Sequence, residues 1–422
     1  MAVLLLLFLT FLILIKCIII RVPIALSEKY PAPGGAWFCI KRFIYLMLIR
    51  YSPRKQTSYG ALKEQEVCGK NKPDNQSGSQ QRSTRDLESP QKLDDNLHAI
   101  DSVYFTAFRE VDKSFIITRV ARRPRNRCEV WLFMRVDGAG DFQHYEHPTT
   151  IMATEANNSW SAGGLTITCV QPYQTWRITF DGFLRKQPFQ YDNSEGDGKR
   201  VYVKFTMLWT ATTEVFDFDY NIHPGSVAHA MALEPISWEF LSAVKKSRDE
   251  HYRYEQWGCL EAEVLIFGEA ERCMTLRGVR SHSYGVRNWA DFHRYVMFLM
   301  RFENGASVHL NIVSLSKTTR HFLVGYMIFP DGKKAGIEWS DAHLSNLADD
   351  RDIKENYQIC FTAGGQSFTV NATLPYKSRP LIHNPSLTSC TKSIVGTTYE
   401  CIATFRTATG DEGWGLVEFF YE

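Results

Sequence analysis

The chain has 422 residues, of which 44% are hydrophobic and 13% aromatic, enough for two or three domains with sizeable cores. Its 48 basic and 46 acidic residues leave a formal charge of only +2, so no overall positive field favours a nucleic-acid partner. The ten cysteines form no C-x-x-C pair and no Cys/His cluster with zinc spacing, so we expect free thiols, no metal and no other cofactor.

Residues 1–22 are predicted to form a transmembrane anchor. Residues 2–20 read AVLLLLFLTFLILIKCIII, about the length that crosses a hydrocarbon core, with Lys16 as the one charged side chain. Basic residues follow this run, which places the body in the cytosol. We therefore expect a single-pass protein of the endoplasmic reticulum or another endomembrane. A signal peptide cleaved near residues 25–27 is the alternative.

Residues 23–51 are predicted to be a juxtamembrane or interfacial segment. The stretch 37–51, WFCIKRFIYLMLIRY, is apolar, but Lys41 and Arg42 near its middle would be costly at the centre of a bilayer. A helix in the membrane surface would let these side chains reach the headgroups. A helix packed on the folded body explains the pattern equally well.

Residues 52–97 are predicted to be a disordered linker. Serine, glutamine, asparagine and charged residues dominate this stretch, and large apolar side chains are few. Such a composition buries too little apolar surface to offset the entropy of ordering the chain. We therefore expect a flexible tether between the anchor and the body.

From residue 98 onward the pattern is that of β-strands. In residues 201–209, VYVKFTMLW, apolar side chains alternate with mostly polar ones, as in a strand with one buried face. Glycine-rich turns separate many such runs, and only residues 223–246 look helical. We expect an all-β body: two tandem antiparallel lipocalin-like barrels, 98–246 and 247–422, joined by a short helical segment.

Two motifs carry a family resemblance: Tyr254-Glu255-Gln256, and RGVRSHSYGVRNW over residues 277–289. They resemble the paired motifs of the superfamily that includes the AttH proteins, the carotenoid hydratases and the fungal oxidative-stress survival factors. They are also similar to the N-terminal module of animal phosphoenolpyruvate-synthase-like proteins. The resemblance implies two lipocalin-like barrels with lipid or isoprenoid ligands. Weaker matches include the closing Gly413-Trp-Gly415 and Glu418.

The chain departs from the family pattern at two positions. Ser281 stands where the family usually has aspartate, and Tyr284 where it has tryptophan. In the hydratase-like relatives that acidic residue is the natural proton donor to an alkene. A serine hydroxyl cannot replace it at neutral pH, so we lean against an enzyme and assign no catalytic residue.

The candidate ligand-binding residues are Glu255, Arg280, His282 and Tyr284. In a strand, Arg280, His282 and Tyr284 point to one face, and Ser281 points to the other. The first interpretation is a mostly apolar pocket in which Arg280 and His282, with Glu255 as counter-ion, bind a ligand headgroup. The second is a buried Arg280–Glu255 pair that fixes how the barrels dock.

The leading functional hypothesis is a membrane-anchored protein that binds or carries a lipid or another hydrophobic small molecule. The alternative is an enzyme acting on an isoprenoid or lipid, such as a hydratase, isomerase or cyclase, using His282, Tyr284 or Glu255. The third is a scaffold that binds a protein partner. The three remain open because function resides in sites and not in folds.

Overall fold

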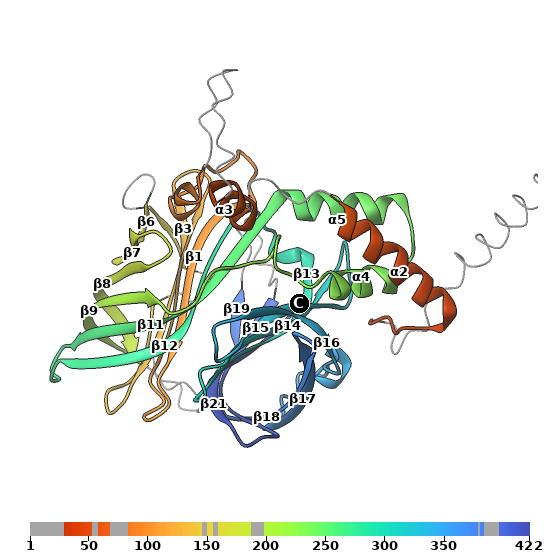
Figure 1. The fold of residues 1–422 in the computed structure, drawn as a ribbon. Coiled ribbons are helices and arrows are strands. Elements are labelled where there is room, and N and C mark those ends of the chain that lie inside the picture. Colours follow the sequence, from red (N-terminus) through yellow and green to blue (C-terminus); the bar gives the residue numbers. More distant parts are fainter. Residues whose placement is uncertain are drawn as a thin grey trace, which may run out of the picture.

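The computed structural model describes residues 29–52, 58–67, 83–145, 150–154, 159–186, 198–378, 380–383 and 396–422 (Figure 1). The predicted anchor lies outside these residues. Within them, no helix is both long and apolar enough to span a bilayer. The body is all-β and consists of two closed antiparallel barrels with a few helices, as the alternating sequence pattern predicts.

The first barrel is a closed circuit of eight strands, each hydrogen-bonded to the next, with β9 pairing β11 to complete the ring. In circuit order these are β1 (Ala99–Phe108), β2 (Phe115–Arg123), β3 (Arg127–Val136), β4 (Gly140–Gln143), β8 (Thr175–Lys186), β9 (Lys199–Ala211), β11 (His251–Ile266) and β12 (Arg272–Val286). Short strands extend the sheet: β5 (Thr150–Ala153), β6 (Trp160–Ala162), β7 (Leu165–Gln171) and β10 (Phe216–Asp217).

The second barrel is also a closed circuit of eight strands, and β18 pairs β20 to complete it (Figure 1). In circuit order these are β13 (Phe292–Phe302), β14 (Ser307–Leu315), β15 (Phe322–Ile328), β16 (Lys334–Ser340), β17 (Asn356–Ala363), β18 (Gln366–Lys377), β20 (Gly396–Thr407) and β21 (Glu412–Tyr421). The short strand β19 (Leu381–His383) pairs with β20, and the turns η2 (Trp289–Asp291) and η3 (Leu344–Asn346) complete this half.

The structure places the boundary between the barrels later than residue 246. The hairpin of β11 and β12, which follows the helical segment, belongs to the first barrel. β11 pairs with β9, and β12 pairs with β1. Without this hairpin the first sheet would be open between β1 and β9, so the joint lies between β12 and β13. Strand pattern alone could not show which sheet the hairpin joins.

The helical segment expected over residues 223–246 is present as α4 (Pro224–Leu233) and α5 (Trp238–Glu250). α2 (Gly35–Tyr51) packs on α4, which in turn lies against β15 and β16 of the second barrel. The alternative of a helix packed on the body is therefore correct for one face of α2.

The described parts of the expected linker are folded. α3 (Tyr59–Val67) and the turn η1 (Arg85–Glu88) lie on the first barrel. The side chains of Leu62 and Leu87 are buried in one small cluster with Tyr252 and Tyr254 of β11. A disordered linker is thus wrong for these two stretches. Leu62 and Leu87 can hold these two stretches in place because the barrel supplies the apolar surface on which they pack. The composition of the stretch itself does not show that surface.

The interiors of both barrels are occupied by side chains. In the first barrel, Phe105 makes edge contacts with the rings of Trp176 and Trp209, which are buried. Aliphatic and aromatic side chains fill the second barrel in the same way. A cavity of about 430 Å³ lies outside, at the turn between β2 and β3, and one of about 10 Å³ lies where Trp257 approaches Arg301 of the second barrel.

Candidate functional site

The register of β11 and β12 separates the four predicted residues. Gln256 lies opposite Arg280, and Glu255 lies opposite Ser281. Since side chains alternate along a strand, Arg280 points into the first barrel, and Glu255 points outward with Ser281. The predicted Arg280–Glu255 pair is therefore wrong, because the two side chains lie on opposite faces of the sheet.

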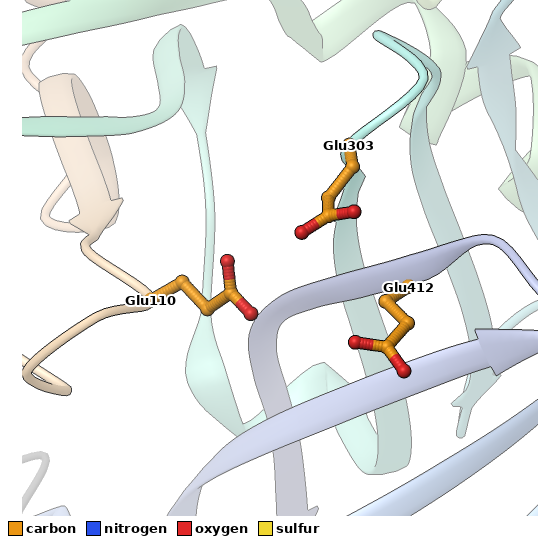
Figure 2. A group of neighbouring side chains, drawn as sticks. All are labelled: Glu110, Glu303 and Glu412. Atoms are coloured by element: carbon orange, nitrogen blue, oxygen red, sulfur yellow. The ribbon is translucent and has the colours of Figure 1, made fainter.

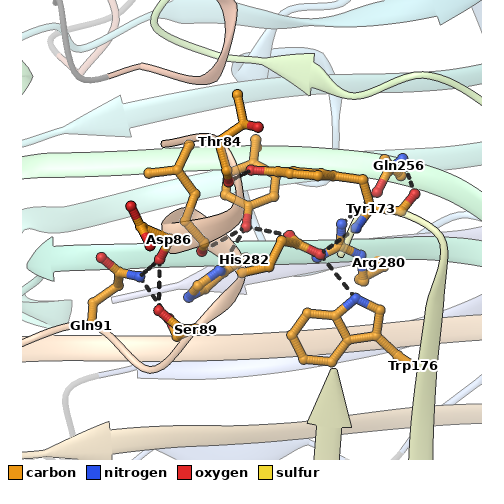
Figure 3. Close-up of polar contacts among 12 residues, drawn as sticks. Thr84, Asp86, Ser89, Gln91, Tyr173, Trp176, Gln256, Arg280 and His282 are labelled. Atoms are coloured by element: carbon orange, nitrogen blue, oxygen red, sulfur yellow. Dashed lines mark hydrogen bonds and ion pairs between the residues drawn. The ribbon is translucent and has the colours of Figure 1, made fainter. Parts of the chain in front are cut away.

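The partner of Arg280 is Glu88 of η1, at 2.9 Å between Nη1 and Oε1. The Tyr254 hydroxyl donates to Glu88 at 2.5 Å and lies 2.8 Å from Nδ1 of His282. Nε2 of His282 lies 2.7 Å from the Asp101 carboxylate. We call these five residues the inner network. All are at most 2% exposed, and Figure 3 shows Arg280 beside the Trp176 indole.

Each residue of the inner network has a polar partner within it. Arg280 also donates to Gln256, and its guanidinium lies 5.0 Å from the ring centre of Trp176. Burial alone would raise the pKa of Glu88, but the Arg280 charge and the Tyr254 hydrogen bond outweigh it and lower that pKa. The contacts fix η1 in the mouth of the first barrel. We infer a structural role, and ligand binding by Arg280 and His282 stays a prediction.

Tyr284 lies at the edge of this network. Its ring centre is 5.6 Å from that of His282 and 5.0 Å from that of Tyr252, and its side chain is half-buried. The structure therefore brings together three of the four predicted site residues and places Glu255 elsewhere. The sequence missed Glu88, which stands in a stretch with no strand or helix pattern.

Glu255 fastens the two barrels together. Its carboxylate lies 2.7 Å from Nδ1 of His309 and accepts a hydrogen bond of 3.1 Å from Tyr326, both in the second barrel. Arg253 of the first barrel also donates to it. Burial would raise the pKa of Glu255, but Arg253 and His309 lower it to about 2. Glu255 therefore has the predicted role in docking the barrels, but its partners are Arg253, His309 and Tyr326 and not Arg280.

We expect acid to weaken this junction. Because the pKa of Glu255 is about 2 in the folded chain against an ordinary 4.5, its stabilisation is complete above pH 4.5 and is lost as the pH falls toward about 2. The urea concentration at the unfolding midpoint should fall between pH 4.5 and about 2, and it should fall less in Glu255→Gln than in wild type. Glu263→Gln, on the exposed face of β11, is the control. Equal pH dependence of wild type and Glu255→Gln would contradict the assignment.

A second polar cluster lies between the barrels. Ser281, Tyr104 and Arg119 stand opposite one another across β12, β1 and β2 and face the second barrel. Glu400 of β20 and Glu418 of β21 are directly opposite each other on the surface that faces this row. Their exposed fractions are 3% and 5%. We call Glu400 and Glu418 the carboxyl pair.

Burial and mutual repulsion favour a proton on the carboxyl pair. Burial and the charge of Glu418 raise the pKa of Glu400 well above its ordinary value, and burial also raises that of Glu418. Two carboxylates in contact and out of water cannot both be ionised near neutrality. Tyr295 donates a hydrogen bond to Glu418, which favours placing the proton on Glu400.

Buried groups of the first barrel surround the pair. Burial, and then the charges of Glu400 and Glu418, raise the pKa of Tyr104 well above its ordinary value. Burial lowers the pKa of Arg119 to about 10, against the opposing effect of Glu129. The result is a set of hydroxyl, guanidinium and carboxyl groups in a nearly water-free junction, the combination that general acid and base catalysis uses.

A third group, of three carboxylates, lies at an edge of the junction (Figure 2). Glu110 follows β1, Glu303 follows β13 and Glu412 begins β21, with one oxygen of each within 4.8 Å of the others. Two of the three side chains are exposed. Exposed carboxylates often gather without an ion, and we assign this group no role.

The comparisons with known proteins come from a family model and from solved structures. A model described as a family of unknown function (DUF8627) matches residues 3–421. No curated protein matches the sequence. An AttH-like protein of Nitrosomonas europaea is similar over 82% of this chain and 97% of its own, at 10% identity and a TM-score of 0.46.

Two further solved structures are similar. Kievitone hydratase of Nectria haematococca has 11% identity and a TM-score of 0.40, covering 76% of this chain and 89% of its own. CghA with Sch210972 has 8% identity and a TM-score of 0.45, covering 76% and 88%. One of the three is named for AttH, a member of the superfamily that the motifs resemble, and we take no residue role from any of them. The likeness to the animal module stays a prediction.

Proposed function

The chain belongs to the DUF8627 family, whose function is unknown, and we propose that it is an enzyme that protonates an unsaturated, apolar substrate between its two barrels. The observation that carries this proposal is the carboxyl pair. The aspartate that donates a proton in the hydratase-like relatives is replaced by Ser281 in this chain. A carboxyl group that stays protonated at neutral pH can take over that role. It comes from the second barrel and faces the row that contains Ser281.

The proposed chemistry is a proton transfer to carbon. The protonated carboxyl group gives its proton to one carbon of a C=C bond, and the other carbon becomes a cation. Addition of water, with loss of a proton to the same carboxylate, completes a hydration. Loss of a different proton to that carboxylate gives an isomer. Attack by a second C=C bond of the same molecule closes a ring and moves the cation to another carbon, which then loses a proton to the carboxylate. In each case the carboxyl pair ends with the proton it began with.

The surroundings of the pair fit an apolar substrate. Apolar side chains from the outer faces of both barrels form one cluster, which includes Phe115 and Phe133 of the first and Met297 and Phe420 of the second. The aromatic faces would stabilise a developing cation. The cavity of about 10 Å³ at Trp257 and Arg301 is too small for such a substrate and is not lined by the carboxyl pair. We therefore propose that the substrate enters when side chains of this cluster move apart.

A carrier is supported less well. The described interiors of both barrels and the junction between them all contain packed apolar side chains, so space does not separate the two hypotheses. The carboxyl pair favours an enzyme, because a carrier does not need a proton donor. The proposed partner remains a hydrophobic small molecule, but the contact lies between the barrels.

The test follows deuterium from solvent into carbon. Full-length protein in heavy water is incubated with farnesol, geranylgeraniol or squalene, and the products are analysed by mass spectrometry. We expect carbon-bound deuterium with at least one probe, and in the free protein an infrared band of a protonated carboxyl group at neutral pH that Glu400→Gln removes. Absence of that band, or no deuterium with any of the three probes, would overturn the proposal.

A further inference from the structure

α2 is apolar on two opposite faces. Phe38 and Tyr45 are buried against Ala228 and Ala232 of α4. On the opposite side a stripe of large apolar residues is in solvent, with exposed fractions between 43% and 84%: Ile40, Phe43, Ile44, Leu48 and Tyr51. A group of large apolar side chains on an exposed face usually marks an interaction surface. The outer face of α2 thus lacks a covering layer within the described chain.

α2 is fixed on the body, so this face has a defined direction. The buried Lys41 donates from Nζ to the backbone carbonyl of Glu234 at 2.7 Å, at the carboxyl end of α4. A cation at that end of a helix is favourable. In Figure 1, α2 lies at the periphery of the molecule, beyond α4. Its stripe of apolar side chains therefore faces away from both barrels.

The charges of α2 indicate what covers it. The helix contains Lys41, Arg42 and Arg50 and no acidic residue. On a helical projection at 100° per residue, Arg42 and Arg50 lie on one flank between the buried and exposed apolar faces. Basic side chains beside an apolar stripe are the arrangement of helices that lie in a membrane surface, where the cations reach anionic headgroups.

The sequence before α2 brings a bilayer within reach. The apolar run that is predicted to cross the membrane ends at Ile20, and α2 begins at Gly35. The 15 residue steps from 20 to 35 span at most about 50 Å even when fully extended. A bilayer that holds the run is therefore within range of α2. This step rests on the predicted anchor.

We propose that α2 docks on an anionic lipid surface through Ile40, Phe43, Ile44, Leu48 and Tyr51. The occupant of the stripe is the bilayer, with acyl chains against the apolar side chains and anionic headgroups beside Arg42 and Arg50. α4 then lies between the membrane and the second barrel. The body is held at one orientation to the bilayer instead of swinging on a tether.

The test measures depth in the bilayer on the full-length chain. The exposed Cys39 and Cys273 are changed to serine, and a fluorophore is attached to Phe43→Cys or, as the control, to Phe267→Cys on a distant exposed turn of the first barrel. Each protein is reconstituted in vesicles of equal parts phosphatidylcholine and phosphatidylserine, with and without brominated acyl chains. We expect strong loss of fluorescence at position 43 and none at position 267.

A second variant separates α2 from the anchor. In a Leu48→Asp background the protein should remain in the vesicles, and the loss of fluorescence at position 43 should disappear while the unfolding midpoint stays unchanged. Equal quenching at positions 43 and 267 would overturn the proposal. So would a detergent-solubilised dimer that Leu48→Asp dissociates, because a second copy of the chain would then cover the stripe.

Discussion

Changing Arg280 to methionine is expected to lower the free energy of unfolding by about 3–5 kcal/mol. The guanidinium and its partner Glu88 are 0% and 1% exposed, so removal of the cation leaves a carboxylate buried without a counter-ion. Urea unfolding followed by tryptophan fluorescence measures the change, because Trp176 and Trp209 lie against Arg280.

The double variant Arg280→Met with Glu88→Gln separates the ion pair from packing. It removes both charges, so much of the lost stability should return. Lys333→Met, which breaks an ion pair at a solvent-exposed turn, is the control and should have little effect. If Arg280→Met were as stable as this control, the inner network would not hold η1 on the barrel.

Changing Glu418 to glutamine is expected to slow carbon protonation by about 10²–10⁴-fold, the usual contribution of a positioned acid or base. Glutamine keeps the shape of the side chain but removes the charge that helps to raise the pKa of Glu400, so Glu400 holds its proton less well. The rate of deuterium incorporation measures the loss, and Glu263→Gln on the exposed face of β11 is the matched control. A rate within a few-fold of wild type would exclude Glu418 from the reaction.

The raised pKa values fix the pH dependence. A carboxyl group whose pKa is higher in the folded chain binds more protons there, so its stabilising contribution is present at low pH and is lost as the pH rises through the raised pKa. Activity should fall over the same pH range, because the carboxyl group is then ionised and can no longer donate a proton. Glu400→Gln should make the unfolding midpoint less sensitive to pH there, and an unchanged profile would contradict a shared proton.

The sequence predicts the architecture well and the pairing of elements poorly. Alternation and turn residues indicate antiparallel barrels, and the helical segment is found at α4 and α5. The sequence pattern predicts the wrong barrel for the hairpin of β11 and β12, because strands of both sheets have the same period of alternation. Composition made residues 52–97 a linker, whereas Leu87 and Glu88 are buried there against the barrel.

The candidate site shows the same division. Alternation placed Arg280 and His282 on one face correctly, but the counter-ion depends on register, which a single strand does not specify. Glu418 carries a usable signal: it is a lone carboxylate within the apolar run GLVEFFY. Glu400 stands between Tyr399 and Cys401 in the same way. What no pattern shows is that these two carboxylates lie opposite each other.

The closure of the first barrel by its last hairpin has a consequence for synthesis. β1 ends at residue 108, and the strand that it needs on one side, β12, begins at residue 272. About 160 residues must therefore leave the ribosome before the barrel can shut. Until then both edges of the nascent sheet are unpaired. Chains with such distant strand pairings fold slowly and expose unpaired strand edges that are prone to aggregate. The first barrel should therefore depend on chaperones more than the second barrel does.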